Sequence, residues 1–294
     1  MAAICKEDFL YHTVEGVELM ATVYRPNMTG PVPFVIDVHG GAWGSGDRFN
    51  NKTIHHSFVQ SGIGVFALEF RLSSEAQFPD PVREANYGVR WFKENLDYLN
   101  VETSLIGGLG SSRGAQQLGL VATQPTNPLY AVPDKQLTGT DATLDFFIAC
   151  WPILDPLARY QMVKEKKIDR LLEAHHSYFS SPSDMMIGNP YMVVKEGRAT
   201  HMPPIAIIQG EADENVDHFR ADMFAEVYRK AGGHIEVHKY AAQPHTFVEN
   251  APKDPDAKDA IIKLEKFIFS LNNLKLGIII RSSDKTPQPS GRIL

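Results

Sequence analysis

Residues 106–115 read IGGLGSSRGA, with two adjacent serines set among four glycines. Only Ser112 has a glycine two residues before it, Gly110, and another two residues after it, Gly114. In a G-x-S-x-G pattern between a strand and a helix, side chains at the glycine positions would collide with the crossing elements. An apolar run precedes this stretch, and AQQLGLVAT follows it. The spacing therefore predicts a sharp strand-to-helix turn that presents Ser112, and the alternative is a plain glycine-rich connection.

Strand-like and helix-like segments alternate on both sides of this turn. Apolar runs of buried-strand length occupy residues 34–38, 63–70, 103–108, 144–151, 203–210 and 234–240. Helix-like patterns occupy residues 80–96, 115–123, 218–233 and 255–273. Alternation of this kind predicts an α/β fold with a mostly parallel central sheet and helices on both of its faces.

The two ends of the chain and one long segment depart from this alternation. Residues 9–26 read as two extended runs around a Glu-Gly turn, which predicts an antiparallel hairpin at the N-terminus. Residues 155–200 are too long for a simple connection and predict a helical lid insertion. We expect one domain over residues 1–274, followed by a tail over residues 275–294. The first part of this tail, KLGIII, is apolar, and residues 281–294 look unstructured and could be an artificial addition.

The segment HGGAW, residues 39–43, follows a buried-looking strand and supplies small residues near its end. Small residues let backbone N–H groups point into a site. We expect those of Gly41 and Ala42, with that of Arg113, to form an oxyanion hole. His39 is expected only to hold the loop in place, and Trp43 to form a wall of the substrate pocket.

A serine hydroxyl needs a neighbouring base, and a group that orients the base, before it becomes a useful nucleophile. Asp213 stands where a buried strand ends and is preferred over Glu211 and Glu214, for which solvated surface roles are expected. His245 lies in the loop after the next strand-like run. The order Ser112, Asp213, His245 is the order expected for an α/β-hydrolase arrangement.

Composition restricts the remaining possibilities. The 294 residues carry a net charge of −6 with no cluster of Lys and Arg, which argues against a nucleic-acid partner. We see neither a membrane span nor an export signal, so a cytoplasmic location is expected. Cys5 and Cys150 stand in unlike settings and are expected to be reduced thiols, with Cys150 in the core. The histidine pairs at 55–56 and 175–176 lack metal-ligand spacing, so no metal is expected.

With these motifs, the chain resembles esterases of the α/β-hydrolase fold, of the hormone-sensitive-lipase type, in the branch with H-G-G-x-W. Residues 70–91 resemble the Y-R-L-x-P-E…F-P…D-x-x-x-A-x-x-W stretch of that family, with Glu84 where an aspartate is usual. The resemblance implies hydrolysis of carboxylic esters through an acyl-enzyme, without a cofactor. Ser112 would be the nucleophile, His245 the general base and then acid, and Asp213 the group that orients it.

The residue after the nucleophile departs from the family pattern. Members usually have a small residue there, whereas this chain has Arg113. One hypothesis is that its guanidinium receives a carboxylate of the substrate. The other, which we favour at this point, is a structural ion pair.

The expected partner is a small-molecule ester of small or medium size, and a homodimer is an open option. Residues 155–200 contain soft and aromatic side chains that suit an apolar acyl or alcohol group, and that equally suit ordinary packing. These are Tyr160, Met162, Tyr178, Phe179, Met185, Met186 and Met192. One alternative is an amide or formamide hydrolase, similar to kynurenine formamidase, on the same residues. Less favoured alternatives are a non-catalytic binding protein with this fold, which commonly lacks the histidine, and a peptidase domain.

Overall fold

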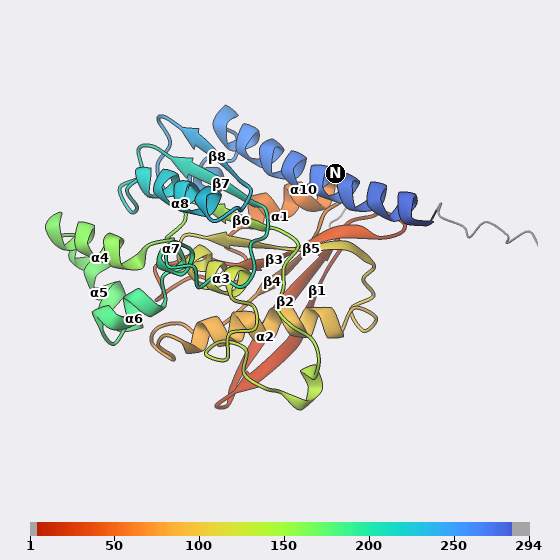
Figure 1. The fold of residues 1–294 in the computed structure, drawn as a ribbon, viewed down its shortest axis with the longest axis horizontal. Helices are drawn as coiled ribbons and strands as arrows, with labels where there is room; N and C mark the ends of the chain where they lie inside the picture. Colours follow the sequence, from red (N-terminus) through yellow and green to blue (C-terminus); the bar gives the residue numbers. More distant parts are fainter. Residues whose placement is uncertain (1–4, 284–294) are drawn as a thin grey trace, which may run out of the picture.

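The computed structural model describes the backbone of residues 5–283 and the side chains of residues 5–275, and it contains one eight-stranded mixed sheet (Figure 1). The strands are β1 (Cys5–Val14), β2 (Val17–Arg25), β3 (Val32–Val38), β4 (Gly64–Leu68), β5 (Thr103–Ser111), β6 (Phe147–Cys150), β7 (Ile205–Gly210) and β8 (Ile235–Tyr240). Their order across the sheet is β1-β2-β4-β3-β5-β6-β7-β8. β2 runs antiparallel to both of its neighbours, and the pairs from β4 to β8 are parallel. The predicted hairpin and the mostly parallel sheet are both confirmed.

Helices cover both faces of the sheet, and the side chains of each strand alternate between the two faces. On one face lie α1 (Lys52–Gln60) and α10 (Pro255–Ser283); on the other lie α2 (Asp80–Glu94), α3 (Arg113–Thr123) and α8 (Phe219–Lys230) (Figure 1). Along β3, Phe34 and Ile36 pack in the core with α2 and α3, whereas Val35 packs in the core with α1 and α10. The sheet is therefore buried on both sides, as its continuous apolar strands predict.

Residues 155–200 form four short helices at one end of the sheet, of which Figure 1 shows α4, α5 and α6 projecting furthest. They are α4 (Pro156–Glu165), α5 (Asp169–Tyr178), α6 (Pro182–Ile187) and α7 (Pro190–Lys195). α4, α6 and α7 each begin with proline behind a capping side chain, respectively Asp155, Ser181 and Asn189. The insertion is helical as predicted.

The short helices η1 (Lys135–Leu137) and α9 (Phe247–Asn250) lie in connections. α10 continues to Ser283, so the apolar start of the expected tail is helical, and the expectation of an unstructured segment from residue 281 is wrong as far as residue 283. Residues 256–286 contain no proline to stop the helix. Residues 284–294, the rest of the expected tail, lie outside the described residues. None of the described helices is both long and apolar enough to cross a membrane.

Candidate functional site

The turn between β5 and α3 holds Ser112 in a strained backbone conformation. Its φ of 51° and ψ of −115° lie outside the regions that residues with a side chain normally adopt. A Cβ atom at Gly110 would lie 2.6 Å from Cα of Ala115, and one at Gly114 would overlap the carbonyl oxygen of Val38. Both glycines are therefore required by close backbone approach, which confirms the predicted sharp turn.

Ser112, His245 and Asp213 lie in one continuous line of hydrogen bonds. Oγ of Ser112 is 3.0 Å from Nε2 of His245, and Nδ1 of His245 is 2.7 Å from Oδ2 of Asp213. Asp213 follows β7, and His245 lies in the loop between β8 and α9. The carboxyl ends of the parallel strands thus bring together three residues that are distant in the sequence, at the edge where ligands bind in open α/β sheets.

Asp213 is held as a carboxylate. Burial raises its pKa, but the hydrogen bond and charge of His245, the N–H of Val216 and the amide of Gln209 outweigh this, so the pKa lies below its ordinary value. Its Oδ1 accepts from the backbone N–H groups of Asn215, at 2.8 Å, and Val216, at 3.0 Å. The ionised side chain accepts the Nδ1 proton of His245, which leaves Nε2 free to accept the hydroxyl proton of Ser112.

The neighbouring carboxylates do not share this position. Glu211 lies within 3.3 Å of the ammonium group of Lys239, and Glu214 is exposed to solvent. Both lie at the surface, as the sequence predicts for them.

The loop after β3 brings backbone N–H groups close to Ser112. Gly41, Ala42 and Trp43 have successive positive φ angles of 115°, 48° and 64°. Gly41 and Ala42 line the same cavity as Ser112. The N–H groups of Gly41, Ala42 and Arg113 donate to no other group within the described part of the chain. This arrangement leaves them available to a ligand.

Trp43 does not line that cavity, contrary to the sequence prediction. Its side chain is fully buried, its ring stacks on Tyr178 at a centroid distance of 5.3 Å, and its Nε1 donates to Gln116. Tyr178 and Phe179 of the insertion enclose the ring, and the sequence of the HGGAW segment carries no sign of this contact. Trp43 therefore supports the loop from beneath.

The guanidinium of Arg113 holds this loop in place. It is fully buried and donates from Nε to the carbonyl of Gly40 at 3.0 Å, from Nη1 to that of Trp43 at 3.1 Å and from Nη2 to that of Ser45 at 3.0 Å. It also lies 4.8 Å from the ring centroid of Phe70. Burial lowers the pKa of Arg113 to about 9, so the group stays protonated at neutral pH.

Both hypotheses for the Arg113 side chain are therefore wrong. It has no access to a substrate, and it forms no ion pair with any described carboxylate. Carbonyl dipoles and an aromatic face replace the anionic partner. His39 completes the support, since its buried ring stacks on Phe70 at 4.5 Å and its Nδ1 lies 2.8 Å from the carbonyl oxygen of Gly40. Burial lowers the pKa of His39 well below its ordinary value, so the ring is neutral and holds the loop as expected.

A buried polar network contacts the turn at Ser111, the residue before Ser112, and sequence reasoning missed it. Asn51 donates from Nδ2 to Asp37 at 2.8 Å and to the hydroxyl of Ser111 at 3.1 Å. Nε2 of His55 lies 2.8 Å from the other oxygen of Asp37. Asp37 is the only polar residue in the apolar run FVIDV, residues 34–38, and a single acidic residue in a buried strand was the available signal.

The cavity beside Ser112 is small, about 240 Å³, and mostly polar. Sequence reasoning missed Arg159, Arg170 and Asn215, which line it together with Trp151. The soft residues of the insertion do not line it. Tyr178, Phe179, Met185 and Met162 are buried in the core, and Met186 is exposed to solvent. The sequence left two roles open for these residues, a substrate pocket and ordinary packing. Their positions agree with ordinary packing.

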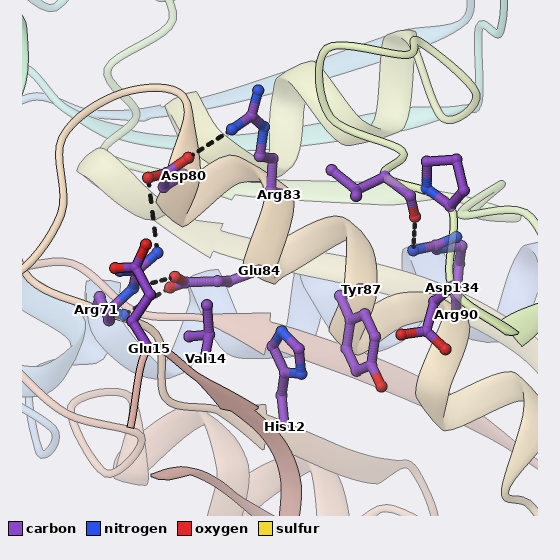
Figure 2. A pocket seen from close by; sticks show the side chains of 12 residues that line it. His12, Val14, Glu15, Arg71, Asp80, Arg83, Glu84, Tyr87, Arg90 and Asp134 are labelled. Atoms are coloured by element: carbon purple, nitrogen blue, oxygen red, sulfur yellow. Dashed lines mark hydrogen bonds and ion pairs between the residues drawn. The ribbon is translucent and has the colours of Figure 1, made fainter. Parts of the chain in front are cut away.

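A second cavity of about 300 Å³ lies between β1 and α2, and Figure 2 shows its polar lining. Arg71 contacts Glu84, Glu15 and Asp80, and Arg83 contacts Asp80 at 2.7 Å. Glu84, which replaces the usual aspartate, reaches both the backbone N–H and Nε of Arg71. The carboxylates of this cavity are thus largely satisfied by its own arginines.

Cys150 is buried in β6, and Cys5 is exposed. Burial raises the pKa of the Cys150 thiol well above its ordinary value, which agrees with a role in core packing. Over residues 5–275, no group of three or more His, Cys, Asp and Glu side chains converges as a metal site would.

Comparison with known families places this chain among esterase-like sequences. The model of the BD-FAE family matches residues 21–228, a segment that includes Ser112 and Asp213. The chain is 24% identical over 232 residues to lipase 2 of Moraxella sp. strain TA144, covering 71% of this chain and 53% of that protein. It is 23% identical over 269 residues to ethyl acetate hydrolase of Pseudomonas putida, covering 88% and 80%. The chain thus spans about half the length of the first relative and four-fifths of the second.

Solved structures share the fold. Esterase 2 of Thermogutta terrifontis with bound propionate superposes with a TM-score of 0.73 at 21% identity, covering 90% of this chain and 94% of that one. The same enzyme phosphorylated by paraoxon superposes equally well, at 20% identity and the same coverage. The fold is therefore that of the α/β-hydrolase esterases.

Proposed function

Because this chain belongs to the BD-FAE family, we propose that it is a serine hydrolase that cleaves small carboxylic esters through an acyl-enzyme intermediate. The observation that carries the proposal is the line of hydrogen bonds from Ser112 through His245 to Asp213. A hydroxyl, an imidazole and a buried carboxylate in this geometry are the parts of a serine hydrolase triad. Relatives named as lipase and ethyl acetate hydrolase support the same reaction class.

In the proposed mechanism, Nε2 of His245 takes the hydroxyl proton of Ser112 while Oγ attacks the ester carbonyl carbon. The C=O electron pair moves onto the carbonyl oxygen, which the N–H groups of Gly41, Ala42 and Arg113 stabilise as an oxyanion. One such donor is typically worth roughly 3 kcal/mol of transition-state stabilisation. The imidazolium then returns the proton to the leaving alcohol, and water repeats the two steps on the acyl-enzyme to release the acid.

Asp213 acts on the imidazole rather than on the substrate. By accepting the Nδ1 proton it keeps His245 in the tautomer whose Nε2 can accept from Ser112. It also stabilises the positive charge that His245 carries after the first proton transfer. The two backbone N–H groups on its Oδ1 fix the direction of the carboxylate.

The insertion contributes to the same site in this proposal. Met162, Val163 and Leu171, from α4 and α5, form a small apolar cluster against which Ala42 packs. We propose that residues 155–200 form a lid on a single domain that spans residues 1–274. The free thiols Cys5 and Cys150 and the net charge of −6 support a cytoplasmic enzyme whose partner is a small ester rather than nucleic acid.

Covalent labelling tests the proposal. A fluorophosphonate should modify Ser112, and Ser112→Ala should abolish the labelling and lower kcat on nitrophenyl esters by about 10⁴-fold or more. Ser61→Ala, at an exposed serine that follows α1, is the matched control and should keep the labelling. An adduct on another residue, or wild-type ester hydrolysis by Ser112→Ala, would overturn the assignment. Comparison of an aryl ester with N-formylkynurenine separates ester from formamide hydrolysis.

A further inference from the structure

Two arginines line the cavity at Ser112 and neither is paired with a carboxylate of the described residues. Arg159 of α4 and Arg170 of α5 both line it. Within the described residues, no Asp or Glu oxygen lies within 4.0 Å of either group. Two acidic residues that flank helices have other partners: Asp155, before α4, pairs with Arg220, and Asp217, before α8, pairs with Lys166. The cavity therefore has an excess of positive charge.

Arg159 is fixed in place by neutral groups. Its side chain is only 3% exposed, its Nε donates to the carbonyl of Asn215 at 2.9 Å, and its guanidinium lies 5.5 Å from the ring centroid of Trp43. Its Nη1 lies 3.4 Å from Nε2 of His175, whose Nδ1 in turn lies 2.8 Å from the carbonyl oxygen of Leu171. Burial lowers the pKa of His175 to about 3, so this imidazole is neutral and accepts rather than balances the charge.

Asp213 is the one carboxylate of the described residues that acts on Arg159 electrostatically, and its oxygens already accept hydrogen bonds from other groups. Burial lowers the pKa of Arg159 to about 10, Asp213 opposes this effect, and the positive charge of Arg170 adds to it. Asp213 binds His245 and two backbone N–H groups, so it cannot turn towards Arg159. A buried cation without its own counter-ion is costly, and an anion in the cavity would neutralise the charge of Arg159. Arg170 is exposed to solvent, so it adds a positive charge at the cavity without that desolvation cost.

The second cavity shows one way in which this chain holds a structural arginine. Arg113, held by carbonyl groups alone, shows another, but it is fully buried and does not line the cavity at Ser112, whereas Arg159 does. Figure 2 shows Arg71 surrounded by carboxylates, with Glu15, Asp80 and Glu84 all within ion-pair distance. The cavity at Ser112 has the opposite arrangement. Its remaining lining consists mainly of amide, hydroxyl and backbone groups, among them Asn50, Asn51 and Asn215.

We propose that the site selects esters that carry a carboxylate group, which Arg159 and Arg170 bind while Ser112 attacks the ester carbonyl. The planar fork of a guanidinium matches the two oxygens of a carboxylate. A cavity of about 240 Å³ restricts the substrate to small molecules, such as half-esters of short dicarboxylic acids or acetylated hydroxy acids. This inference rests on the proposed function and adds the substrate class to it.

Pairs of esters with the same shape and different charge test the proposal. Monomethyl succinate and methyl levulinate have the same shape, but the acyl part of the first ends in a carboxylate and that of the second ends in a methyl ketone. Acetoxyacetate and acetoxyacetone differ by the same replacement of a carboxylate by a methyl ketone, here in the alcohol part of the ester. In at least one pair, kcat/KM for the anion should exceed that for the neutral ester by about tenfold or more, as expected for hydrogen bonds to a charged group.

Variants assign this preference to the arginines. Arg170→Gln should lower the ratio of kcat/KM for the anionic ester to that for the neutral ester by about tenfold. The matched control is Arg198→Gln, which removes the same charge from a side chain paired with Glu196 outside the cavity. Because Arg159 is buried, thermal unfolding must first show that Arg159→Lys and Arg159→Gln both fold. The kcat/KM for the anionic ester is then compared between Arg159→Lys, which keeps the charge, and Arg159→Gln, which removes it.

A binding measurement gives an outcome that does not depend on turnover. Levulinate should slow the fluorophosphonate labelling of Ser112 in the wild type, and the neutral analogue 2,5-hexanedione should not. If the members of both ester pairs are cleaved equally and levulinate gives no protection, the carboxylate proposal is overturned and the ester hydrolase stands. If Ser112 is not labelled and none of the esters is cleaved, the proposed function and the carboxylate proposal are both overturned.

Discussion

Nε of Arg113 donates a 3.0 Å hydrogen bond to the carbonyl oxygen of Gly40, which ties the residue after Ser112 to the loop before Gly41 and Ala42. The two backbone segments that supply the proposed oxyanion donors are thus connected by one side chain. Because that side chain also bonds Trp43 and Ser45, the loop has little freedom to move away from Ser112.

Replacing this arginine should therefore damage catalysis without changing any group that touches the substrate. In Arg113→Lys, an ammonium cannot reach three carbonyls in different directions. We expect kcat to fall by about 10- to 100-fold, within the range for a misplaced oxyanion donor, with a smaller change in KM. Urea unfolding should show a loss of about 1–3 kcal/mol, because buried carbonyls lose their donors. Arg83→Lys, at a half-exposed ion pair with Asp80, is the control, and an equal loss of kcat there would contradict the prediction.

Asp213→Asn should separate the effect of Asp213 on the orientation of His245 from its effect on the stability of the fold. The amide oxygen can still accept from the N–H groups of Asn215 and Val216, but the amide nitrogen would present protons to Nδ1 of His245. The imidazole would then adopt the wrong tautomer, and kcat should fall by about 10⁴-fold with little change in thermal stability. Asp217→Asn removes a surface carboxylate paired with Lys166 and should keep most of the activity. A loss of less than tenfold in Asp213→Asn would contradict the role of this residue.

Gly114→Ala should prevent the turn at Ser112 from forming. The new methyl group would overlap the carbonyl oxygen of Val38, a backbone atom at the end of the paired strand β3 that cannot move independently. We expect a loss of stability of more than about 4 kcal/mol, or no soluble protein. In the same helix, a methyl group at Gly119 would meet only side-chain atoms of Pro190 and Leu154, at 3.3 Å or more. Gly119→Ala should therefore fold normally, and similar denaturation curves for the two variants would disprove the steric argument.

His175 should contribute to acid sensitivity. In the folded protein burial lowers its pKa to about 3, whereas the unfolded chain has the ordinary value of 6.5. Between these pH values the unfolded state binds a proton that the folded state does not, so this contribution to stability is fully present above pH 6.5 and is lost as pH falls towards 3. The expected slope is about 1.4 kcal/mol per pH unit for the one group.

Denaturant unfolding of His175→Gln between pH 6.5 and 4.5 checks this, since glutamine can still donate to Leu171 and accept from Arg159. The free energy of unfolding of the variant should fall less steeply with acid than that of the wild type, by up to one bound proton. His176→Gln alters the exposed neighbour and should keep the wild-type slope. Parallel curves for His175→Gln and the wild type would refute the prediction.

The sequence predicted those features that local sterics determine. The glycines at 110 and 114 identify the turn, because any larger residue there would strike the backbone that every such turn brings close. The alternating apolar runs predict the parallel sheet, since strands buried on both faces need continuous apolar sequence. The order of Ser112, Asp213 and His245 then follows from the order of the strands that carry them.

The features that the sequence did not predict depend on contacts between distant segments. Whether Trp43 faces a cavity or the core depends on Tyr178, which belongs to a different helix. The surroundings of Arg113 depend on how the loop after β3 folds back, and nothing within the GSSRG segment encodes that. Arg159 and Arg170 reach the cavity through the packing of α4 and α5, and helical spacing alone gives no direction towards Ser112.

The apolar cluster of Met162, Val163 and Leu171 against Ala42 has a consequence for how such enzymes diversify. Because the insertion rests on the loop that presents Gly41 and Ala42, we expect substitutions in one segment to require matching substitutions in the other. A chimera that takes residues 155–200 from a relative would need the HGGAW segment of the same donor, or reactivity and selectivity would both drift. Engineering of new substrate selectivity in this protein should therefore vary the two segments together.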